Sequence, residues 1–294
     1  MKAAKAIVTL AIGDKYHQHW KHSCEVSWNA YGRQHGFDVI CIDKPLDDSE
    51  RARKRSPAWQ KCLILSQEFS QRYERIIWID SDILINNHAA PAIDDGVPLE
   101  KVGAVEEFTY AREAGARRHV LLQRLYSYWD KAVINYAPEE YYTKYGLPGT
   151  FNKVVQTGVL VMSPRHHRAL LEKAYNDYEE KGGPEWKYEM RLLSYELLKA
   201  DAVHWIDRRF NLVWIYSLFL HYPFLLNPHL DDSFSGRLKR KLAATLGAPS
   251  FVTLQGACLT AVFLDSFFFH IGGSSFEQME QVNQAAKSFL DCGL

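Results

Sequence analysis

The chain has 294 residues, 47% of them hydrophobic and 24% charged, a composition typical of an ordinary globular protein that excludes a disordered or fibrous one. Because 35 basic residues balance 35 acidic ones, the formal net charge is zero, so we expect no nucleic-acid partner held by broad electrostatic attraction. The five cysteines are scattered without a Cys-x-x-Cys pair, which indicates neither a disulfide framework nor a zinc site and fits a reducing compartment.

The amino-terminal segment predicts a strand rather than a signal peptide. Lys2 and Lys5 precede a short apolar run, residues 6–12, but Asp14 and Lys15 follow it without a small-residue cleavage site. No stretch of the sequence approaches the length that spans a bilayer. The sequence therefore predicts a cytoplasmic protein.

The first part of the chain alternates between strand and helix patterns. Apolar strand patterns cover residues 6–12, 37–42 and 76–79, and helical patterns cover residues 17–34 and 57–69. Strands that alternate with helices are typical of a parallel sheet with covering helices. The sequence therefore predicts an α/β fold.

The rest of the chain continues this alternation with longer loops. In order, we expect a strand at 102–105, a helix at 116–130, an aromatic loop at 136–151, a strand at 154–163, helices at 164–180 and 188–199, strands at 203–206 and 266–270, and a helix at 275–290. Residues 221–256 show no clear pattern apart from a basic amphipathic piece at 237–242.

Two carboxylates follow the most hydrophobic strand. Residues 76–79 are apolar on both faces, as in a buried parallel strand, and Asp80-Ser81-Asp82 comes directly after them. Asp80 and Asp82 can converge on one divalent ion where the chain leaves the sheet, and open α/β sheets bind ligands at that edge. The alternative is a solvated turn or a helix N-cap, since Asp-x-Asp is common by chance. The buried strand in front favours a metal-assisted nucleotide or phosphate site.

A histidine closes a later apolar run. His270 follows residues 267–269, which are all phenylalanine, and precedes Ile271-Gly272-Gly273. An imidazole together with carboxylates suits Mn²⁺ as well as Zn²⁺. The alternative is a core histidine with satisfied hydrogen bonds. Because His270 lies 188 positions after Asp82 (270 − 82), only the fold can join the two.

Several short motifs in a defined order carry a resemblance to a known family. They are a turn at 9–16, a helix at 59–69 that bears Lys61, the acidic strand end at 78–82, Gln156-Thr157-Gly158 near a strand start, an acidic helix leading to Phe-Asn over 189–211, and His270-Ile271-Gly272-Gly273. With them the chain resembles the GT-A glycosyltransferases, especially retaining families of the glycogenin, lipopolysaccharide galactosyltransferase and xyloglucan xylosyltransferase kind. The resemblance covers most of residues 3–216 and 264–275.

The resemblance implies a fold class and its division. We expect a Rossmann-like α/β GT-A fold, in which a mixed, mainly parallel sheet is flanked by helices in a single domain. Residues 1–105 would form the nucleotide-binding half. Residues 106–294 would form the acceptor-binding half and end in the terminal helix.

The resemblance also implies a site for a nucleoside diphosphate sugar such as a UDP-sugar. Asp80, Asp82 and His270 would hold Mn²⁺ or Mg²⁺ on the diphosphate, where the ion offsets charge on the leaving group. The other implied donor contacts are Thr9, Ala11 and Tyr16 at base and ribose, Asp80 and Ser81, Lys61 at phosphate or sugar, and Thr157, Gly158, Gly272 and Gly273. For Lys61, an ordinary exposed helix lysine is the alternative.

Two positions depart from the pattern of the family. Gln156 stands where an asparagine is usual, and Glu189 is the nearest acidic residue where the family often has an acidic pair. We expect these two side chains near the anomeric carbon, as the candidate catalytic groups. A helix-capping or solvated role is the alternative for Glu189.

The acceptor is expected to be a glycan, a lipid-linked sugar or another hydroxyl compound. Basic residues at 51–55 and 236–242 can attract an anionic acceptor or produce peripheral membrane contact, but solvated loops are the interpretation that we favour. Two other functions compete with a transferase. One is a sugar nucleotidyltransferase, whose Gly-rich basic signature is too sparse at residues 11–15; the other is a catalytically inactive carbohydrate-binding protein on the same fold.

Overall fold

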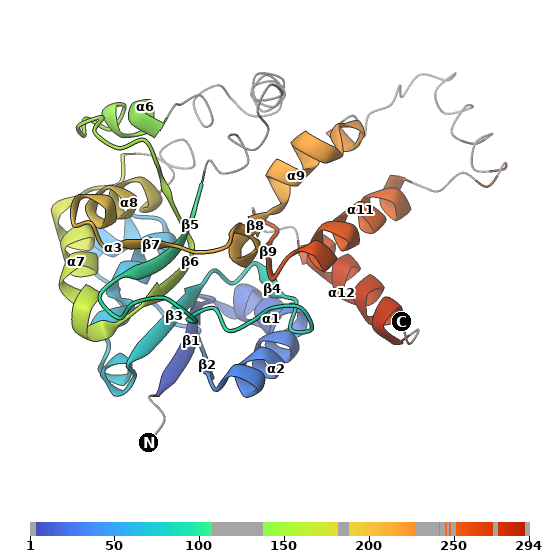
Figure 1. The fold of residues 1–294 in the computed structure, drawn as a ribbon, viewed down its shortest axis with the longest axis horizontal. Coiled ribbons are helices and arrows are strands. Elements are labelled where there is room, and N and C mark those ends of the chain that lie inside the picture. Colours follow the sequence, from blue (N-terminus) through green and yellow to red (C-terminus); the bar gives the residue numbers. More distant parts are fainter. Residues whose placement is uncertain are drawn as a thin grey trace.

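The computed structural model describes residues 4–107, 138–181, 188–226, 251–272 and 276–291, together with positions 241, 245 and 247 (Figure 1). The helix expected at 116–130 and most of the basic piece at 237–242 lie outside the described residues. Within the described part, an α/β architecture is built on two sheets.

The larger sheet has six strands in the order β2-β1-β3-β6-β5-β7. Their bounds are β1 Lys5–Leu10, β2 Asp38–Ile42, β3 Arg75–Ile79, β5 Val102–Glu106, β6 Val155–Met162 and β7 Val203–Trp205. The pairs β1–β2, β1–β3 and β5–β7 are parallel, whereas β3–β6 and β5–β6 are antiparallel. Of these six strands only β6 is reversed, so the prediction of a mixed, mainly parallel sheet is confirmed.

Helices cover both faces of this sheet. Successive side chains of a strand point to opposite faces, and in β1 and β3 the residues Ile7 and Ile77 join one apolar cluster while Val8 and Trp78 join another. The first cluster includes side chains from α1 Asp14–Ser23, α2 Glu25–His35, α9 Trp214–His221, α11 Phe251–Asp265 and α12 Phe276–Asp291. The second includes side chains from the 3₁₀ helix η1 Pro57–Ser66, from α7 Pro164–Asp177 and from α8 Met190–Lys199. Burial on both faces is why these strands read as continuous hydrophobic runs.

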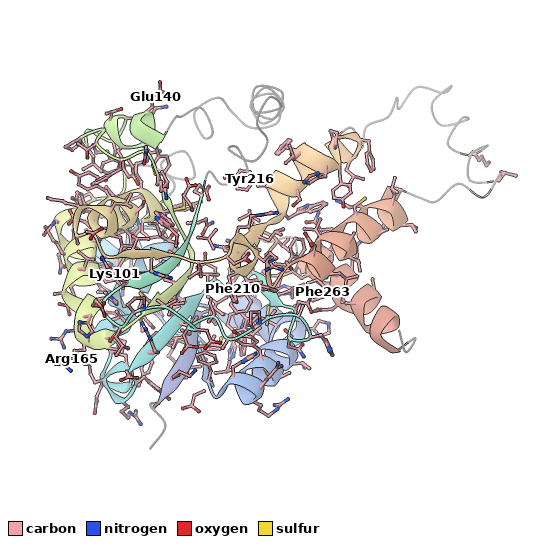
Figure 2. All side chains as sticks on the ribbon, viewed as in Figure 1. Lys101, Glu140, Arg165, Phe210, Tyr216 and Phe263 are labelled. Atoms are coloured by element: carbon pink, nitrogen blue, oxygen red, sulfur yellow. The ribbon has the colours of Figure 1, made fainter. Side chains whose placement is uncertain are left out.

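A small sheet brings together strands from the first and last thirds of the chain. Its strands are β4 Ile83–Ile85, β9 Phe268–His270 and β8 Leu212–Val213, in the order β4-β9-β8. The antiparallel pairing of β4 with β9 sets Ile83 opposite His270. Phe210 and Phe263, which Figure 2 labels, place their ring centroids 4.9 Å from Phe267 and 6.4 Å from Phe269 respectively. The phenylalanine run thus anchors β9 in the core.

Short elements complete the described part. They are α3 Glu50–Arg53, the 3₁₀ helices η2 Glu68–Arg72, η5 Arg208–Asn211 and η6 Pro223–Leu226, and α6 Pro138–Thr143. Figure 1 shows α9 and α11 projecting together at one end of the molecule, and α12 packs along α11. None of the described helices is both long and apolar enough to cross a bilayer.

The helix expected at 17–34 is divided in two. The break falls at Cys24, whose φ of −112° departs from helical geometry. The Cys24 thiol donates to the Ile83 carbonyl at 3.4 Å, and the Trp28 indole donates to the same carbonyl at 3.0 Å. Cys24 and Trp28 therefore tie the junction of α1 and α2 to β4. Helical periodicity in the sequence cannot indicate this tertiary contact.

In place of the helix expected at 57–69, the structure has the 3₁₀ helix η1, which ends at Ser66, and the start of η2 at Glu68. The buried side chains of η1 recur every three residues, at Trp59, Cys62 and Leu65, and this spacing matches three residues per turn rather than 3.6. The second buried row includes Lys61, which is only 4% exposed. Lys61 is thus not an ordinary exposed helix lysine.

The basic loop after β2 is tied to the end of α7. Arg55 is 6% exposed, and its guanidinium donates to the carbonyls of Tyr175 and Tyr178 and to the Glu179 carboxylate. Arg51 donates to Glu179 as well, at 2.8 Å. The interpretation of this cluster as a solvated loop is therefore wrong for Arg55, because the guanidinium satisfies carbonyls inside the protein.

We expect Arg55→Ala to lower the free energy of unfolding by about 3 kcal/mol, because it leaves the Tyr175 carbonyl without a charged donor and leaves the Tyr178 carbonyl and the Glu179 carboxylate with Arg51 alone. Urea denaturation followed by circular dichroism measures the change. Arg53→Ala, an exposed arginine two residues earlier at the end of α3, is the matched control and should stay within about 0.5 kcal/mol of the unaltered protein. Equal losses in the two variants would contradict the structural role of Arg55.

Candidate functional site

Asp80 and Asp82 lie in the tight turn between β3 and β4. The amide of Asp80 donates to the Gly158 carbonyl on β6 at 2.8 Å, and the amide of Ile83 donates back to the Asp80 carbonyl at 3.2 Å. These bonds reverse the chain as it leaves the large sheet, and both carboxylates remain partly exposed. The turn therefore presents two acidic groups at the edge of the sheet.

The small sheet brings His270 to Asp82. The His270 Nε2 atom lies 3.3 Å from Asp82 Oδ1, and the Ile271 amide donates to the Asp82 carbonyl at 3.3 Å. One ligand atom from each of Asp80, Asp82 and His270 lies within 4.8 Å of the others. Two carboxylates and one imidazole form a donor set for a divalent cation such as Mn²⁺. The three residues are brought together as the sequence predicts.

A relay of side-chain amides orients the imidazole of His270. Its Nδ1 lies 2.9 Å from Oδ1 of Asn211, and Nδ2 of Asn211 donates to Oε1 of Gln156 at 2.8 Å. Because the Asn211 amide nitrogen is turned to Gln156, its oxygen accepts the Nδ1 proton, which leaves Nε2 for the metal position. Asn211 is 1% exposed, so water does not compete for these bonds.

Gly158 makes room for the same imidazole. A Cβ atom at this position would lie 2.8 Å from Cε1 of His270 and 2.9 Å from Oε1 of Gln156. The Gly158 amide donates to that same Gln156 oxygen at 2.5 Å. A larger residue at 158 would thus push away the ring that completes the donor set.

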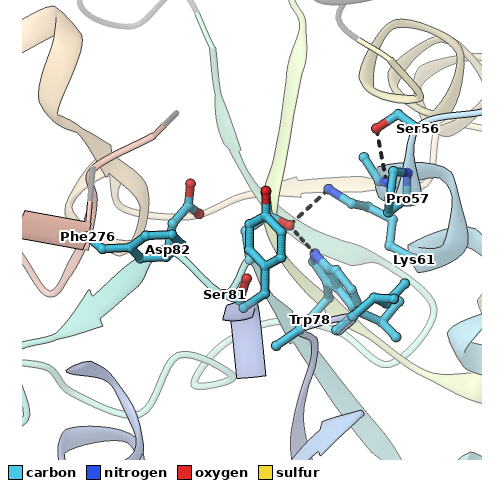
Figure 3. Close-up of a pocket in the computed structure, with 13 residues that line it drawn as sticks. Ser56, Pro57, Lys61, Trp78, Ser81, Asp82 and Phe276 are labelled. Carbon is cyan, nitrogen blue, oxygen red and sulfur yellow. Dashed lines mark hydrogen bonds and ion pairs between the residues drawn. The ribbon is translucent and has the colours of Figure 1, made fainter. Parts of the chain in front are cut away.

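One oxygen of Asp80 is held by two donors. Trp78 Nε1 donates to Asp80 Oδ1 at 2.7 Å, and Lys61 Nζ donates to it at 3.0 Å (Figure 3). Among the described residues, no hydrogen bond goes to Oδ2. The carboxylate is therefore fixed through Oδ1 and offers Oδ2 to a ligand.

Lys61 links Asp80 to Glu189. Its ammonium also lies 2.8 Å from Glu189 Oε1 and 3.2 Å from the Thr157 carbonyl, so its three N–H bonds have three acceptors. The Thr157 hydroxyl donates to the same Glu189 oxygen at 2.9 Å. Glu189 is the N-cap residue of α8, but its carboxylate makes no capping bond; the carboxylate is buried and hydrogen-bonded rather than solvated.

The charges of this network shift the protonation equilibria. Burial alone would lower the pKa of Lys61, but the Asp80 and Glu189 carboxylates raise it above its ordinary value. Burial raises the pKa of Glu189, and Lys61, which is shared with Asp80, only partly offsets this. Burial also disfavours the charged forms of Asp82 and His270, but the attraction between the two side chains outweighs this effect. The pKa of Asp82 is therefore lowered and that of His270 is raised.

A cavity of about 330 Å³ opens beside the carboxylates. Its charged lining residues are Asp80, Asp82 and Lys61, next to Ser81. The rest of its lining is mostly apolar or aromatic: Leu10, Ala11, Ile12, Tyr16, Ser56, Pro57, Ala58, Trp78 and Phe276. The cavity therefore combines two carboxylates with apolar and aromatic walls (Figure 3).

A second cavity of about 630 Å³ meets the first at Ala58, Lys61 and Asp80. Glu189, His270 and Gly272 line it, as does Gln156-Thr157-Gly158. Its far wall comes mainly from the α9 region, with Trp214, Ile215, Tyr216 and Leu218. The network of Lys61, Asp80 and Glu189 thus forms the boundary between the two cavities.

The predicted donor contacts differ in burial and in whether they line a cavity. Ala11, Tyr16 and Ser81 line the smaller cavity, whereas Thr9 is fully buried and lines neither. Gly272 has a φ of 70°, a conformation that favours glycine, and Gly273 lies outside the described residues. Sequence reasoning missed Trp78, Asn211 and Phe276 as site residues. For Asn211 the Phe-Asn motif was the available signal.

Comparison with known proteins identifies the fold class. No family model and no curated protein matches the chain. The chain is similar to a solved glycosyltransferase involved in the glycosylation of the major capsid of PBCV-1, at 14% identity and a TM-score of 0.53 over 96% of this chain and 99% of that one. The chain has a GT-A-like glycosyltransferase fold.

Two further glycosyltransferase structures are similar in outline. The WbbM bifunctional glycosyltransferase matches at 11% identity and a TM-score of 0.50 over 96% of this chain, which spans 50% of the WbbM chain. The galactosyltransferase LgtC, solved with donor and acceptor sugar analogues, matches at 12% identity and a TM-score of 0.43 over 95% of each chain. At these identities the likeness concerns the fold, so the chemistry must be argued from the residues of this chain.

We expect Asn211→Ala to weaken Mn²⁺ binding by about 10- to 100-fold, because the imidazole of His270 loses the acceptor that sets its tautomer and orientation. Calorimetric titration with Mn²⁺ measures the affinity. Asn211→Asp keeps an acceptor for Nδ1 and should lose less. Asn176→Ala, an exposed asparagine on α7, is the matched control. Unchanged affinity in a folded Asn211→Ala protein would show that the relay does not act on the metal position.

Proposed function

We propose that the protein is a metal-dependent glycosyltransferase that moves a sugar from a nucleoside diphosphate sugar to a hydroxyl group of an acceptor. The observation that carries this proposal is the position of the Asp80, Asp82 and His270 triad, at the boundary between two cavities. A transferase needs such an arrangement, because donor and acceptor must meet at one reacting bond. The retaining families that the sequence resembles suggest retention of the anomeric configuration.

The smaller cavity fits the donor. A nucleoside diphosphate has a planar base and a doubly charged linkage, and the cavity lining has both apolar and aromatic residues and the candidate metal ligands Asp80 and Asp82. We assign the base and ribose to the wall of Leu10, Ala11 and Tyr16. The diphosphate then lies beside Asp80 and Asp82.

The charges at the site support metal dependence. Among the described residues that line the smaller cavity, Lys61 is the single cation, and its ammonium is already bonded to Asp80, Glu189 and Thr157. A diphosphate placed there without a cation would face Asp80 and Asp82 as like charges. A bound Mn²⁺ or Mg²⁺ would remove this repulsion and stabilise the leaving nucleoside diphosphate as a Lewis acid. Asp80, Asp82 and His270 would hold it.

The larger cavity fits a carbohydrate acceptor. It combines aromatic faces, from Tyr188, Trp214 and Tyr216, with the side-chain amides of Gln255 and Gln278. Aromatic rings pack against the apolar face of a sugar, and amides satisfy its hydroxyl groups. The Tyr216 hydroxyl donates to Glu107 at 2.6 Å, which fixes one of these rings. We therefore assign this cavity to a glycan acceptor.

Glu189 and Gln156 are the proposed groups at the reacting carbon. Both line the larger cavity near the triad. Glu189 Oε1 is held by Lys61 and Thr157, and among the described residues no hydrogen bond goes to Oε2. We infer that Oε2 of Glu189 faces the sugar and stabilises the positive charge that develops at the anomeric carbon. Gln156 orients Asn211 and, through it, His270.

We expect Asp82→Asn to reduce Mn²⁺-dependent hydrolysis of a nucleotide-sugar donor at least about 100-fold, because the site loses a charged ligand. A panel of nucleotide sugars, assayed with Mn²⁺, with Mg²⁺ and with a chelator, measures the effect. Asp48→Asn, an exposed aspartate, is the matched control and should keep full activity. The enzyme hypothesis fails if no donor binds or reacts with any divalent ion. Formation of a nucleotide sugar from a sugar phosphate would instead indicate a nucleotidyltransferase.

We expect Glu189→Gln to lower kcat for sugar transfer about 100-fold while donor affinity changes little, because the amide keeps the shape but not the charge. Steady-state kinetics and equilibrium donor binding separate the two effects. Glu172→Gln, on α7, is a matched control that lines neither cavity. If the loss falls on donor affinity rather than on kcat, Glu189 serves only to hold Lys61 and Asp80.

A further inference from the structure

The carboxyl-terminal helix begins at the wall of the smaller cavity. Its first residue, Phe276, is one of the lining residues, and it follows the metal-site residue His270 by six positions (276 − 270). Gly272, between them, has a φ of 70° and allows the chain to turn away from β9. Asp82 of the triad and the ring of Phe276 thus line the same cavity (Figure 3).

The ring of Phe276 is held in place by aromatic contacts from α1. It stacks on His19 with a centroid separation of 3.5 Å and an interplanar angle of 3°. It also meets the edge of Tyr16, with centroids 5.9 Å apart at 68°. A face-to-face contact on one side and an edge-to-face contact on the other hold the Phe276 ring in a defined orientation. Phe276 and Tyr16 thus form a continuous aromatic wall, although they lie at opposite ends of the sequence.

The helix that carries Phe276 is firmly packed. Met279 and Val282 are 1% and 0% exposed and belong to the same apolar cluster as α1. The side chain of Asn283 donates to the Ser23 carbonyl, at the end of α1, at 2.7 Å. The position of the Phe276 ring is therefore set by two layers of contacts with α1, and its half-buried face remains at the cavity.

We propose that α12 is part of the donor site, and that Phe276 together with Tyr16 forms the aromatic wall that holds the nucleoside moiety. This inference rests on the proposed function, since it concerns the same donor. A phenyl ring offers nothing to a diphosphate, but it gains dispersion and stacking energy against a planar base or the apolar face of a ribose. Asp80 and Asp82, with the ion that they would hold, already account for the phosphates, so the aromatic ring in the lining serves the nucleoside.

Substitutions of Phe276 and of the triad should affect different parts of the donor, the nucleoside and the diphosphate. Loss of a triad residue should weaken every phosphate-containing ligand. Loss of the Phe276 ring should weaken only ligands that carry a nucleoside. Pyrophosphate, which shares the charged group and lacks the nucleoside, is therefore the informative comparison.

Calorimetric titrations in the presence of Mn²⁺ test the assignment, with UDP, GDP and ADP as nucleoside diphosphates and pyrophosphate as the probe without a base. The variants are Phe276→Ala, Phe276→Leu, which keeps apolar contact with α1 but has no planar face, and Phe276→Tyr, which keeps the ring. Glu277→Ala, at the adjacent exposed position, is the matched control. Circular dichroism and thermal unfolding confirm that each variant is folded.

We expect Phe276→Ala and Phe276→Leu to bind the preferred nucleoside diphosphate about tenfold more weakly, while pyrophosphate affinity stays within about twofold. Phe276→Tyr should lose less affinity than Phe276→Leu, and Glu277→Ala should behave like the unaltered protein. Unchanged nucleotide affinity in Phe276→Leu, or an equal loss for nucleotide and pyrophosphate, would overturn the inference. Failure of the unaltered protein to bind any nucleoside diphosphate would instead overturn the proposed function, so the two failures are distinguishable.

Discussion

The pairing of β9 with β4 is the constraint on which the rest of the site depends. Each strand has three residues, and their register sets His270 beside the end of the acidic turn, with Nε2 3.3 Å from Asp82. The strand is held by the buried phenylalanine run rather than by its few ladder bonds, since Phe268 and Phe269 are fully buried. Apolar packing thus determines where an imidazole meets a carboxylate. The Asn211 relay and the open space at Gly158 then orient the ring.

The second organising feature is an ammonium that is fully committed inside the protein. Lys61 is buried, and its three acceptors include both Asp80 and Glu189. A buried charge of this kind is tolerated only because it is paired and hydrogen-bonded. Its commitment leaves the two carboxylates of the smaller cavity without a free cation among the described lining residues. The same interaction that stabilises the boundary between the cavities therefore supports the proposal of a divalent ion at this site.

The strands and the acidic turn were predictable, whereas several helices were not. Residues 76–79 are hydrophobic on both faces because helices cover both sides of the sheet, so β3 and the carboxylates after it were readable from the sequence alone. The 3₁₀ geometry of η1 was missed because, over a short segment, buried side chains spaced three residues apart look like the three- and four-residue spacing of an α-helix. The break at Cys24 depends on contacts with Ile83, which is distant in sequence. No helix was assigned to α9 or α11, which border or overlap the two ends of the segment 221–256 that shows no clear pattern. The helix α9 is apolar around most of its circumference.

The sequence by itself determined the α/β class, the buried strand that ends in Asp80-Ser81-Asp82 and the histidine at the end of a second apolar run. These are local patterns, and local patterns follow from which faces of a strand are buried. Only the tertiary structure decided that His270 contacts Asp82, that Lys61 is shared by Asp80 and Glu189, and that Phe276 reaches the wall that Tyr16 begins. Each of these contacts joins residues far apart in the chain, and their distances depend on packing, which no spacing in the sequence records.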